Sequence, residues 1–419
     1  MLVEPPDDLP PHIKEERRRT LWSIYLLDKM ATCGRGRPCL FQDKTCQLRL
    51  PCSERAFQAL MTEDVPTLQT VKGLDDLHEA GLDSIAHVVA VTSILSQAAT
   101  YIFRPSEANE EPPWDHTSEY QIICTQLTRF DTYFQSFRDI QNLLAGGPFS
   151  QHSGMEPLTE SFLFFYIMYH MCYCLLQHPF LLRRRIEASG KRTPNKFFAK
   201  AIENCWEHAQ ELTWTLFNAK QAGFNVSATI FSYCSTVTGT INALFQYSED
   251  EQVRVKSSAG LAGNLAHLEA KSKYWKNAAT MVGQSNLRSF TYSPKQATSL
   301  SQFSEDSILY TQLLDTSGYA ISLSPEDTER LYSLCDYGTM STQPSLKSPS
   351  NQPKRPTSSI SHPTVMSEPA LSSPSFGFDF GDLTQTGTFD FSSLGNGQHE
   401  FPSSSADASW TTALWATGF

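Results

Sequence analysis

The chain has 419 residues, with 33 Lys and Arg against 44 Asp and Glu, a formal net charge of -11 and a pI near 5.5. This length allows two or three domains and a large core. The acidic balance argues against a surface that holds nucleic acid by its phosphates, because such binding needs many clustered Lys and Arg side chains. The first residues, MLVEPPDDLPPH, are acidic and proline-rich where a secretory signal would be basic and then apolar, which predicts an intracellular protein.

The cysteines predict free thiols. Ten of them are spread thinly over the chain, which disfavours disulfides in an intracellular protein. Cys33, Cys39, Cys46 and Cys52 are separated by five, six and five residues. None of these intervals is the two-residue spacing that presents two thiolates to one zinc ion. We therefore expect small buried side chains, and no metal, cofactor or catalytic site in this chain.

Apolar residues recur at intervals of three and four from residue 12 to about 285, which predicts helix after helix. The first helix is expected from near Ile13 to a break at Gly34. Further apolar faces follow at Ile85–Ile102, which ends near Pro105, and at Tyr120–Leu144, which ends before a Gly-Gly-Pro break. Later helices are expected around residues 196–220, 227–247 and 264–282.

The most apolar segment is FLFFYIMYHMCYCLL, Phe162–Leu176. Fifteen residues rise about 22 Å as a helix, short of the roughly 30 Å hydrocarbon layer of a membrane, and His170 lies within the segment. This favours a helix buried on all sides over a membrane span. His170 itself is expected to be a core histidine with satisfied hydrogen bonds rather than a ligand or a general base.

Composition divides the chain into five predicted segments. They are a proline-rich lead-in at 1–11, the helical domain at 12–285, a connector at 286–340 with a short helix near 325–335, a linker at 341–376 and a tail at 377–419. The short helix is indicated by Ser324 as a cap and Pro325 at the first helical position. In the linker, 18 of 36 residues are Ser or Pro, which predicts disorder.

The tail mixes aromatic and acidic residues and has no Lys or Arg. Exposed aromatics beside Asp and Gly can dock into shallow apolar grooves of coactivators and become ordered on contact. The alternative is an inert disordered terminus. The side chains expected to make such contacts are Phe378, Phe380, Phe389, Phe391, Trp410 and Trp415.

The stretch EERRRTLWSIYLLDKMATCGRGRP, Glu15 to Pro38, holds the strongest basic motif. Arg17, Arg18 and Arg19 are adjacent in the expected helix and must fan out around it, so they cannot all face one phosphate. Asp28 among apolar neighbours needs charge-assisted partners, for which Arg35 and Arg37 are the candidates. A structural role is favoured, and DNA contact is the alternative.

Three stretches resemble one family. The run RRRTLWSIYLLDK followed by GRGRP, with Phe41 and Asp43 after it, resembles the signature of the fungal-specific regulatory domain, the middle homology region of zinc-cluster transcription factors. YHMCYCLLQHPFLL from Tyr169 is similar to the family's Tyr-His helix and Pro-Phe-Leu turn. NLAHLEAKSKYWKNA from Asn264 resembles its late Leu-and-Trp helix. The resemblance spans roughly Ile13 to Val282 and implies a large irregular all-α bundle followed by the disordered tail.

The resemblance implies structural or regulatory roles for the residues that match its motifs. These are Arg17, Arg18, Arg19, Trp22, Tyr25, Asp28, Gly34, Arg35, Gly36, Arg37, Pro38, Tyr169, His170, Pro179, Phe180 and Trp275. In the family a zinc-cluster module precedes this domain and binds DNA. Here Met1 stands about a dozen residues before the arginine helix, so we expect that module, its zinc and the first helices of the domain to be missing from this chain.

The function implied is the regulatory and activation portion of a nuclear transcription factor that acts on RNA polymerase II transcription. The expected partners are coactivators or other regulators, and DNA only through the missing module. A second copy of the chain and a small-molecule effector are further partners that the family allows, and no membrane is expected. The alternative is a helical co-regulator that binds an effector or a partner and never contacts DNA.

Two further hypotheses concern histidine and basic residues. An enzyme would require a pocket that groups His170, His178 and an acid, and no catalytic motif supports one. Arg183-Arg184-Arg185 with Lys191-Arg192 is either a nuclear-import patch or a basic helix end that complements the helix dipole. Lys354-Arg355-Pro356 is a weaker import candidate.

Overall fold

The computed structural model describes Pro5 and residues 8–34, 38–61, 63–73, 82–105, 110–135, 144, 160–194, 196–248, 250–284 and 335–337. Every structural statement below concerns these residues. The predicted linker and tail, and all of the predicted 325–335 helix except its last residue, lie outside them. The predicted segment boundaries stay predictions.

The described residues are helical, and the structure confirms the all-α class. The α-helices are α1 (Pro11–Ala31), α2 (Glu54–Gln58), α3 (Leu68–Gly73), α4 (Ser84–Phe103), α5 (Glu119–Gln135), α7 (Glu160–Leu176), α8 (Pro179–Ala188), α9 (Phe197–Gln221), α10 (Thr229–Phe245), α11 (Glu251–Ser272) and α12 (Lys276–Gln284), with a short 3-10 helix at Asp43–Thr45. Among these residues the β-structure is an isolated bridge between Arg49 and Thr67.

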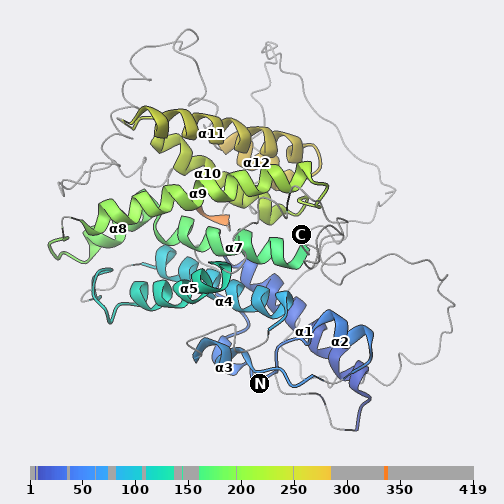
Figure 1. The fold of residues 1–419 in the computed structure, drawn as a ribbon. Helices are drawn as coiled ribbons and strands as arrows, with labels where there is room; N and C mark the ends of the chain where they lie inside the picture. The colour runs from blue at the N-terminus through green and yellow to red at the C-terminus, as the bar shows by residue number, and fades with distance from the viewer. Residues whose placement is uncertain are drawn as a thin grey trace, which may run out of the picture. The chain divides into compact units, whose positions relative to one another are not determined.

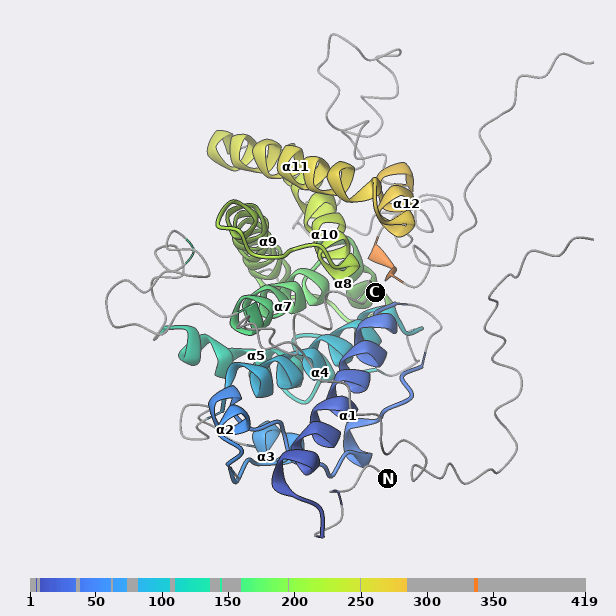
Figure 2. The same ribbon diagram turned by 90° about the vertical axis from the view of Figure 1, so that its right-hand side faces the viewer.

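The helices stack in an order close to that of the sequence (Figures 1 and 2). Helices α1, α2 and α3 lie at one end, α4 and α5 follow, and α11 and α12 lie at the other end. Helix α7 packs between α4 on one side and α9 on the other, while α10 packs against both α9 and α11. The core therefore runs through α4, α7 and α10.

Helices α4 and α7 are apolar around their whole circumference because other helices cover every side. Helix α4 is long and apolar enough to cross a membrane, but 89% of its apolar window is buried within the described structure. It begins where the Asp83 carboxylate accepts a hydrogen bond from the Ser84 N–H at 2.6 Å. It ends before Pro105, which cannot continue a helix.

The helix expected at 264–282 is wrong in its bounds. Helix α11 starts at Glu251, because the Asp250 side chain caps it by accepting from the N–H groups of Gln252 at 2.8 Å and Val253 at 3.3 Å. The chain then turns at 273–275, and α12 follows. The cap was readable from the sequence, but the weak apolar periodicity of the first half of α11 concealed the helix.

Residues 335–337 return to this bundle although some fifty residues separate them from α12. The Tyr233 hydroxyl of α10 donates to the Cys335 carbonyl at 2.7 Å, and the rings of Tyr233 and Tyr337 lie 5.0 Å apart. Cys335 and Asp336 are each 1% exposed. A short piece of chain from the predicted connector is therefore part of the core.

Candidate functional site at the arginine helix

The arginine motif lies on α1, and its three side chains meet three environments. Arg17 is exposed, Arg18 is half-buried and pairs with Glu15, and Arg19 is 4% exposed. Successive residues of a helix point about 100° apart, so this separation follows from the helix itself. The three guanidinium groups do not form one surface.

Arg19 joins α1 to the start of α2. Its Nε donates to Glu15 at 3.1 Å, its Nη1 to Glu54 at 2.6 Å and its Nη2 to the Cys52 carbonyl at 3.1 Å. The guanidinium also lies over the Phe57 ring, 4.1 Å from its centroid. Glu15 in turn accepts from the Cys52 N–H at 3.0 Å. The N–H groups and the face of the Arg19 guanidinium all contact other protein groups, so this side chain cannot hold a phosphate.

Trp22 and Tyr25 fix the next two turns of α1 to the segment that follows it. The Trp22 indole N–H donates to the Arg49 carbonyl at 2.7 Å, and the Tyr25 hydroxyl donates to Asp43 at 2.8 Å. Both side chains are buried, and their rings meet edge to face with centroids 5.0 Å apart. The aromatic residues of the motif are thus core residues whose polar ends have partners.

Asp43 is the charged centre of this region. Its carboxylate pairs with Lys29 at 3.0 Å and with Lys72, and it accepts from the Ser93 hydroxyl at 2.5 Å. Burial works against the charged form, but Lys72, Ser93 and Lys29 outweigh it and hold the pKa of Asp43 well below its ordinary value. The carboxylate of Asp43 is therefore ionised. Burial and the nearby Lys29 lower the pKa of Lys72, although the negative charge of Asp43 acts to raise it, because one carboxylate pairs with two ammonium groups.

Asp28 accepts hydrogen bonds from the backbone. Its two oxygens accept from the backbone N–H groups of Leu40 at 3.1 Å and Phe41 at 3.0 Å. The chain turns back after α1 and presents these amides to the carboxylate. Arg35, Gly36 and Arg37 lie outside the description, so the expected pairing of Asp28 with Arg35 or Arg37 stays a prediction. Gly34 is half-buried and Pro38 is exposed.

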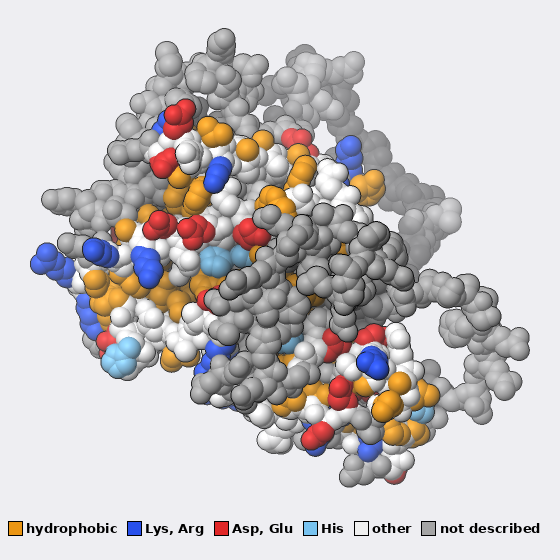
Figure 3. All heavy atoms as spheres, viewed as in Figure 1, with side chains coloured by type: hydrophobic (Ala, Val, Ile, Leu, Met, Phe, Trp, Pro, Cys, Tyr) orange, Lys and Arg blue, Asp and Glu red, His pale blue; other side chains and the backbone are white. Residues whose placement is uncertain are grey.

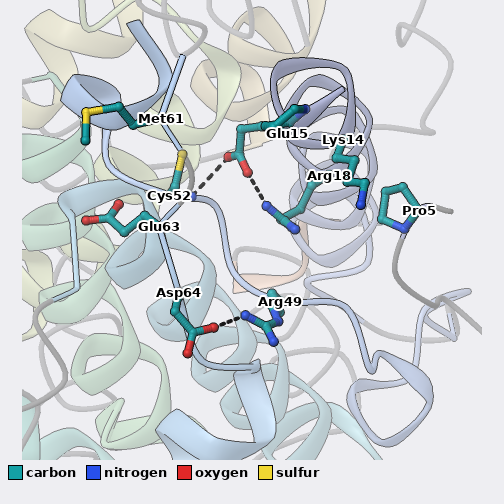
Figure 4. A pocket seen from close by; sticks show the side chains of 10 residues that line it. Pro5, Lys14, Glu15, Arg18, Arg49, Cys52, Met61, Glu63 and Asp64 are labelled. Atoms are coloured by element: carbon teal, nitrogen blue, oxygen red, sulfur yellow. Dashed lines mark hydrogen bonds and ion pairs between the residues drawn. The ribbon is translucent and has the colours of Figure 1, made fainter. Parts of the chain in front are cut away.

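A cavity of about 430 Å³ opens beside Arg18 (Figure 4). Its charged lining is balanced, with Lys14, Arg18 and Arg49 against Glu15, Glu63 and Asp64. Figure 4 shows Arg18 pointing to Glu15 and Arg49 to Asp64, so acids already neutralise these cations. Such a lining offers no excess positive charge for a nucleic-acid backbone.

The second motif lies on α7, where His170 contacts α9 and Tyr169 precedes it. The Nδ1 atoms of His170 and His208 lie 2.8 Å apart, and the His208 ring stacks on Tyr173 at 3.9 Å. Burial lowers the pKa of both histidines, to about 3 for His208. The neighbouring His208 also lowers the pKa of His170. The Tyr169 hydroxyl donates to Asp131. His208 was not singled out from the sequence, because its pairing depends on the α7–α9 contact.

His178 has other neighbours. Its Nε2 lies 3.0 Å from the Thr240 hydroxyl and 3.7 Å from the Cys335 thiol, and burial lowers its pKa to about 3. The described structure therefore does not group His170, His178 and an acid, which was the arrangement required for an enzyme.

The remaining motif residues have structural positions. Pro179 occupies the first turn of α8, where its missing N–H costs no hydrogen bond, and Phe180 is 3% exposed. The Trp275 indole donates to the Ser227 carbonyl at 2.8 Å and fixes the turn between α11 and α12. These side chains stabilise the bundle.

Two arginines of the basic run at 183–185, Arg183 and Arg185, are buried in the protein. Arg183 lies over the Phe198 ring at 4.6 Å, and Arg185 donates to the Arg104 carbonyl at 3.2 Å and pairs with Glu110. An import receptor could not reach these two side chains in the fold, which favours their structural role. Lys191 and Arg192 are exposed, whereas Lys354-Arg355-Pro356 and the six aromatic tail residues lie outside the description.

No group of three or more His, Cys, Asp or Glu among the described residues could hold a metal ion. All ten cysteines are free, and all but Cys39 and Cys124 are buried. Burial raises the pKa values of nine of these thiols, for example to about 12 at Cys33, which keeps them protonated at neutral pH.

The profile of the fungal specific transcription factor domain matches residues 3–144. The chain is also similar to Zn(2)-C6 fungal-type transcription factors of Fusarium oxysporum f. sp. lycopersici. An FTF1c is 25% identical over 278 residues, which are 62% of this chain and 28% of the relative. An FTF1a is 24% identical over 278 residues (62% and 24%), and FTF2 is 25% identical over 279 residues (62% and 24%).

The chain thus spans about a quarter of the length of these relatives. No solved structure matches it. Residues 3–144 therefore match the fungal specific transcription factor domain family, and the chain is a homologue of Zn(2)-C6 fungal-type transcription factors.

Proposed function

We propose that this chain is the regulatory and activation portion of a Zn(2)-C6 transcription factor that controls RNA polymerase II transcription in the nucleus. The observation that carries the proposal is the burial of Arg19 against Glu15, Glu54 and Cys52. The most basic motif of the chain is used to join α1 to α2, so reading DNA falls to a different segment. DNA and zinc binding then belong to a zinc-cluster module outside the described residues.

The tail at 377–419 is proposed to recruit coactivators. Its aromatic side chains stand among acids, with no Lys or Arg in the segment. Such a segment cannot bury enough apolar surface by itself and can dock into an apolar groove of a partner. Net negative charge limits nonspecific binding to nucleic acid while this contact forms.

A reporter assay tests this function. The whole chain, fused to a heterologous DNA-binding domain, is expected to activate a promoter that carries the matching operator. Replacing Phe378, Phe380, Phe389, Phe391, Trp410 and Trp415 by Ser should remove most of that activation. The matched control replaces six serines of the 341–376 linker by Ala and should activate as the parent does. Equal activation by both variants, at equal protein levels, would refute a role for the tail.

A second candidate function is a co-regulator that binds an effector or a partner and does not contact DNA. An open groove between α9 and α11, described below, supports it. The genomic sequence upstream of Met1 separates the two candidates. An in-frame CxxCxxxxxxC pattern would support the transcription factor, and a series of stop codons would support the co-regulator.

A further inference from the structure

A groove with a volume of about 640 Å³ lies between α9 and α11, with α10 at its floor. Figures 1 and 2 show α9 and α11 on either side of α10, and Figure 3 shows hydrophobic side chains in the space between them. Trp214 and Phe217 line the α9 side, and Phe217 is 58% exposed. This volume is in the range of sites that enclose small organic molecules.

The walls of the groove are fixed by hydrogen bonds between helices. The Trp206 indole of α9 donates to Ser257 of α11 at 2.8 Å, and Asn264 of α11 donates to Thr213 of α9 at 3.3 Å. These bonds hold the two helices in one relative position. The groove therefore exists before any ligand arrives, which lowers the entropic cost of binding.

Small residues of α11 leave the groove open. At Gly260 an added Cβ would lie 2.8 Å from the Asn242 side chain, so this glycine is required for the contact between α10 and α11. At Gly263 an added Cβ would meet nothing within 4 Å. Glycine in a helix interior is unfavourable relative to alanine, and packing within the described structure gives no reason for it at position 263. Its effect is to keep space in the groove.

The polar groups of the groove are mainly cationic or unpartnered. Lys220 and Lys256 line it, and neither has an ion-pair partner in the described part of the chain. The Nε2 atom of His267 and the Oγ of Ser235, at the floor, have no hydrogen-bond partner there either. The acid of the lining, Glu211, accepts from the Tyr166 hydroxyl at 3.0 Å.

His267 is neutral at physiological pH. Burial, together with Lys271 and Lys220, lowers its pKa to about 4. A neutral imidazole beside two ammonium groups can donate a hydrogen bond to an anion without first being protonated.

We propose that this groove binds an amphipathic organic anion. Its apolar body would lie over Gly263 and against Trp214 and Phe217, and its anionic group would be held by Lys220 and His267. The inference goes beyond the proposed transcriptional role, because it assigns a small-molecule site to the far end of the helical domain from the arginine motif.

The test uses the full chain and two fluorescent probes of similar shape, 8-anilinonaphthalene-1-sulfonate and the uncharged N-phenyl-1-naphthylamine. The anionic probe should bind with a stoichiometry near one, and more tightly than the neutral probe. Gly263→Leu places a side chain in the open space and should weaken binding of the anion at least about tenfold. Ala262→Leu, at the exposed neighbouring position outside the groove, is the matched control and should bind as wild type does.

The lysines are tested separately. Lys220→Gln should weaken binding of the anionic probe about threefold and leave the neutral probe unaffected. Lys256→Gln, about three helical turns from His267 on α11, should change neither. Lys273→Gln, at an exposed lysine outside the groove, should change neither. Thermal unfolding of each variant shows whether the fold is retained.

Three results would overturn the proposal. The first is equal binding by the Gly263→Leu and Ala262→Leu variants. The second is equal affinity for the two probes with no effect of Lys220→Gln, which would exclude an anion as the ligand class. The third is no binding by the full chain, the result expected if another segment of the chain fills the groove. None of these results depends on promoter activation, so the proposed function is judged independently.

Discussion

Arg17 and Arg19 are identical residues two positions apart on α1, yet they do different things. Arg17 is exposed, whereas Arg19 is 4% exposed and bound by two carboxylates, a carbonyl and an aromatic ring. A buried charge is tolerated only when its partners are present, because burial alone disfavours the charged form. The two positions therefore differ in their expected contribution to stability.

Replacing Arg19 by Met should lower the free energy of unfolding by about 3 kcal/mol, since it removes the hydrogen bonds of the guanidinium to the buried Glu15, to Glu54 and to the Cys52 carbonyl. Arg17→Met, the matched control, should change it by less than about 0.5 kcal/mol. Urea unfolding followed by circular dichroism measures both. Similar losses in the two variants would mean that Arg19 does not hold α1 in place.

Asp43 links stability to pH. Because its folded-state pKa is depressed, its contribution is complete above the unfolded pKa of about 4 and is lost as the pH falls toward the folded value. In this range the unfolded chain binds more protons, so stability rises with pH.

The Asp43→Asn variant should be less stable at neutral pH, and its unfolding free energy should depend less on pH below about pH 5 than that of the wild type. Ser93→Ala removes one hydrogen bond to Asp43 but keeps the charge, and it should retain most of the wild-type slope. Denaturant unfolding at a series of pH values gives the slopes. An unchanged slope in Asp43→Asn would contradict the assignment of Asp43 as the ionised centre.

Helix α11 shows how one element serves two purposes. One face packs against α10, where Gly260 allows Asn242 to approach, and another borders the groove, where Gly263 faces open space. Asp250 caps its first turn, and the turn after Ser272 is fixed by Trp275. The two glycines occupy the same helix but have opposite packing requirements.

Alanine at these two positions gives a matched pair. Both substitutions gain about 1 kcal/mol of helix propensity. Gly263→Ala should keep this gain, whereas Gly260→Ala should be offset by displacement of Asn242, so that it is less stable than Gly263→Ala by about 1–3 kcal/mol. Thermal unfolding compares them directly. Equal midpoints would show that α10 and α11 do not approach as closely as described.

At the scale of the whole molecule, helices from both halves of the domain surround α4 and α7, and residues 335–337 complete the packing at α10. The arginine motif and the α9–α11 groove lie at opposite ends of this stack (Figure 2). On the face in Figure 3, Lys and Arg side chains are interspersed with acidic and hydrophobic ones. Together with a net charge of -11, this predicts weak binding to duplex DNA.

The purified chain should show no sequence-selective affinity for duplex DNA at physiological salt, and any weak binding should disappear as salt rises. Fluorescence anisotropy with a set of labelled duplexes measures this. A selective complex with a submicromolar dissociation constant would contradict the proposal that DNA binding resides in another module.

The positions of five of the described helices could be read from the sequence. The expected bounds agree with α1, α4, α7, α9 and α10 to within a few residues, because the spacing of apolar side chains reflects the face each helix buries. The motif at 15–38 also pointed to an interlocked first helix. Weakly periodic α11 was misread, because its apolar face is broken by small and polar residues.

The sequence by itself determined the helical class, the family resemblance and the different directions in which Arg17, Arg18 and Arg19 point. These features depend on local periodicity and on residues close together in the chain. Only the tertiary structure decided which partners fill the core. Backbone amides hold Asp28, Lys72 and Ser93 converge on Asp43, and His208 meets His170. The partners of Asp43 and His170 are far apart in sequence, and only the packing of separate segments brings them within hydrogen-bonding distance.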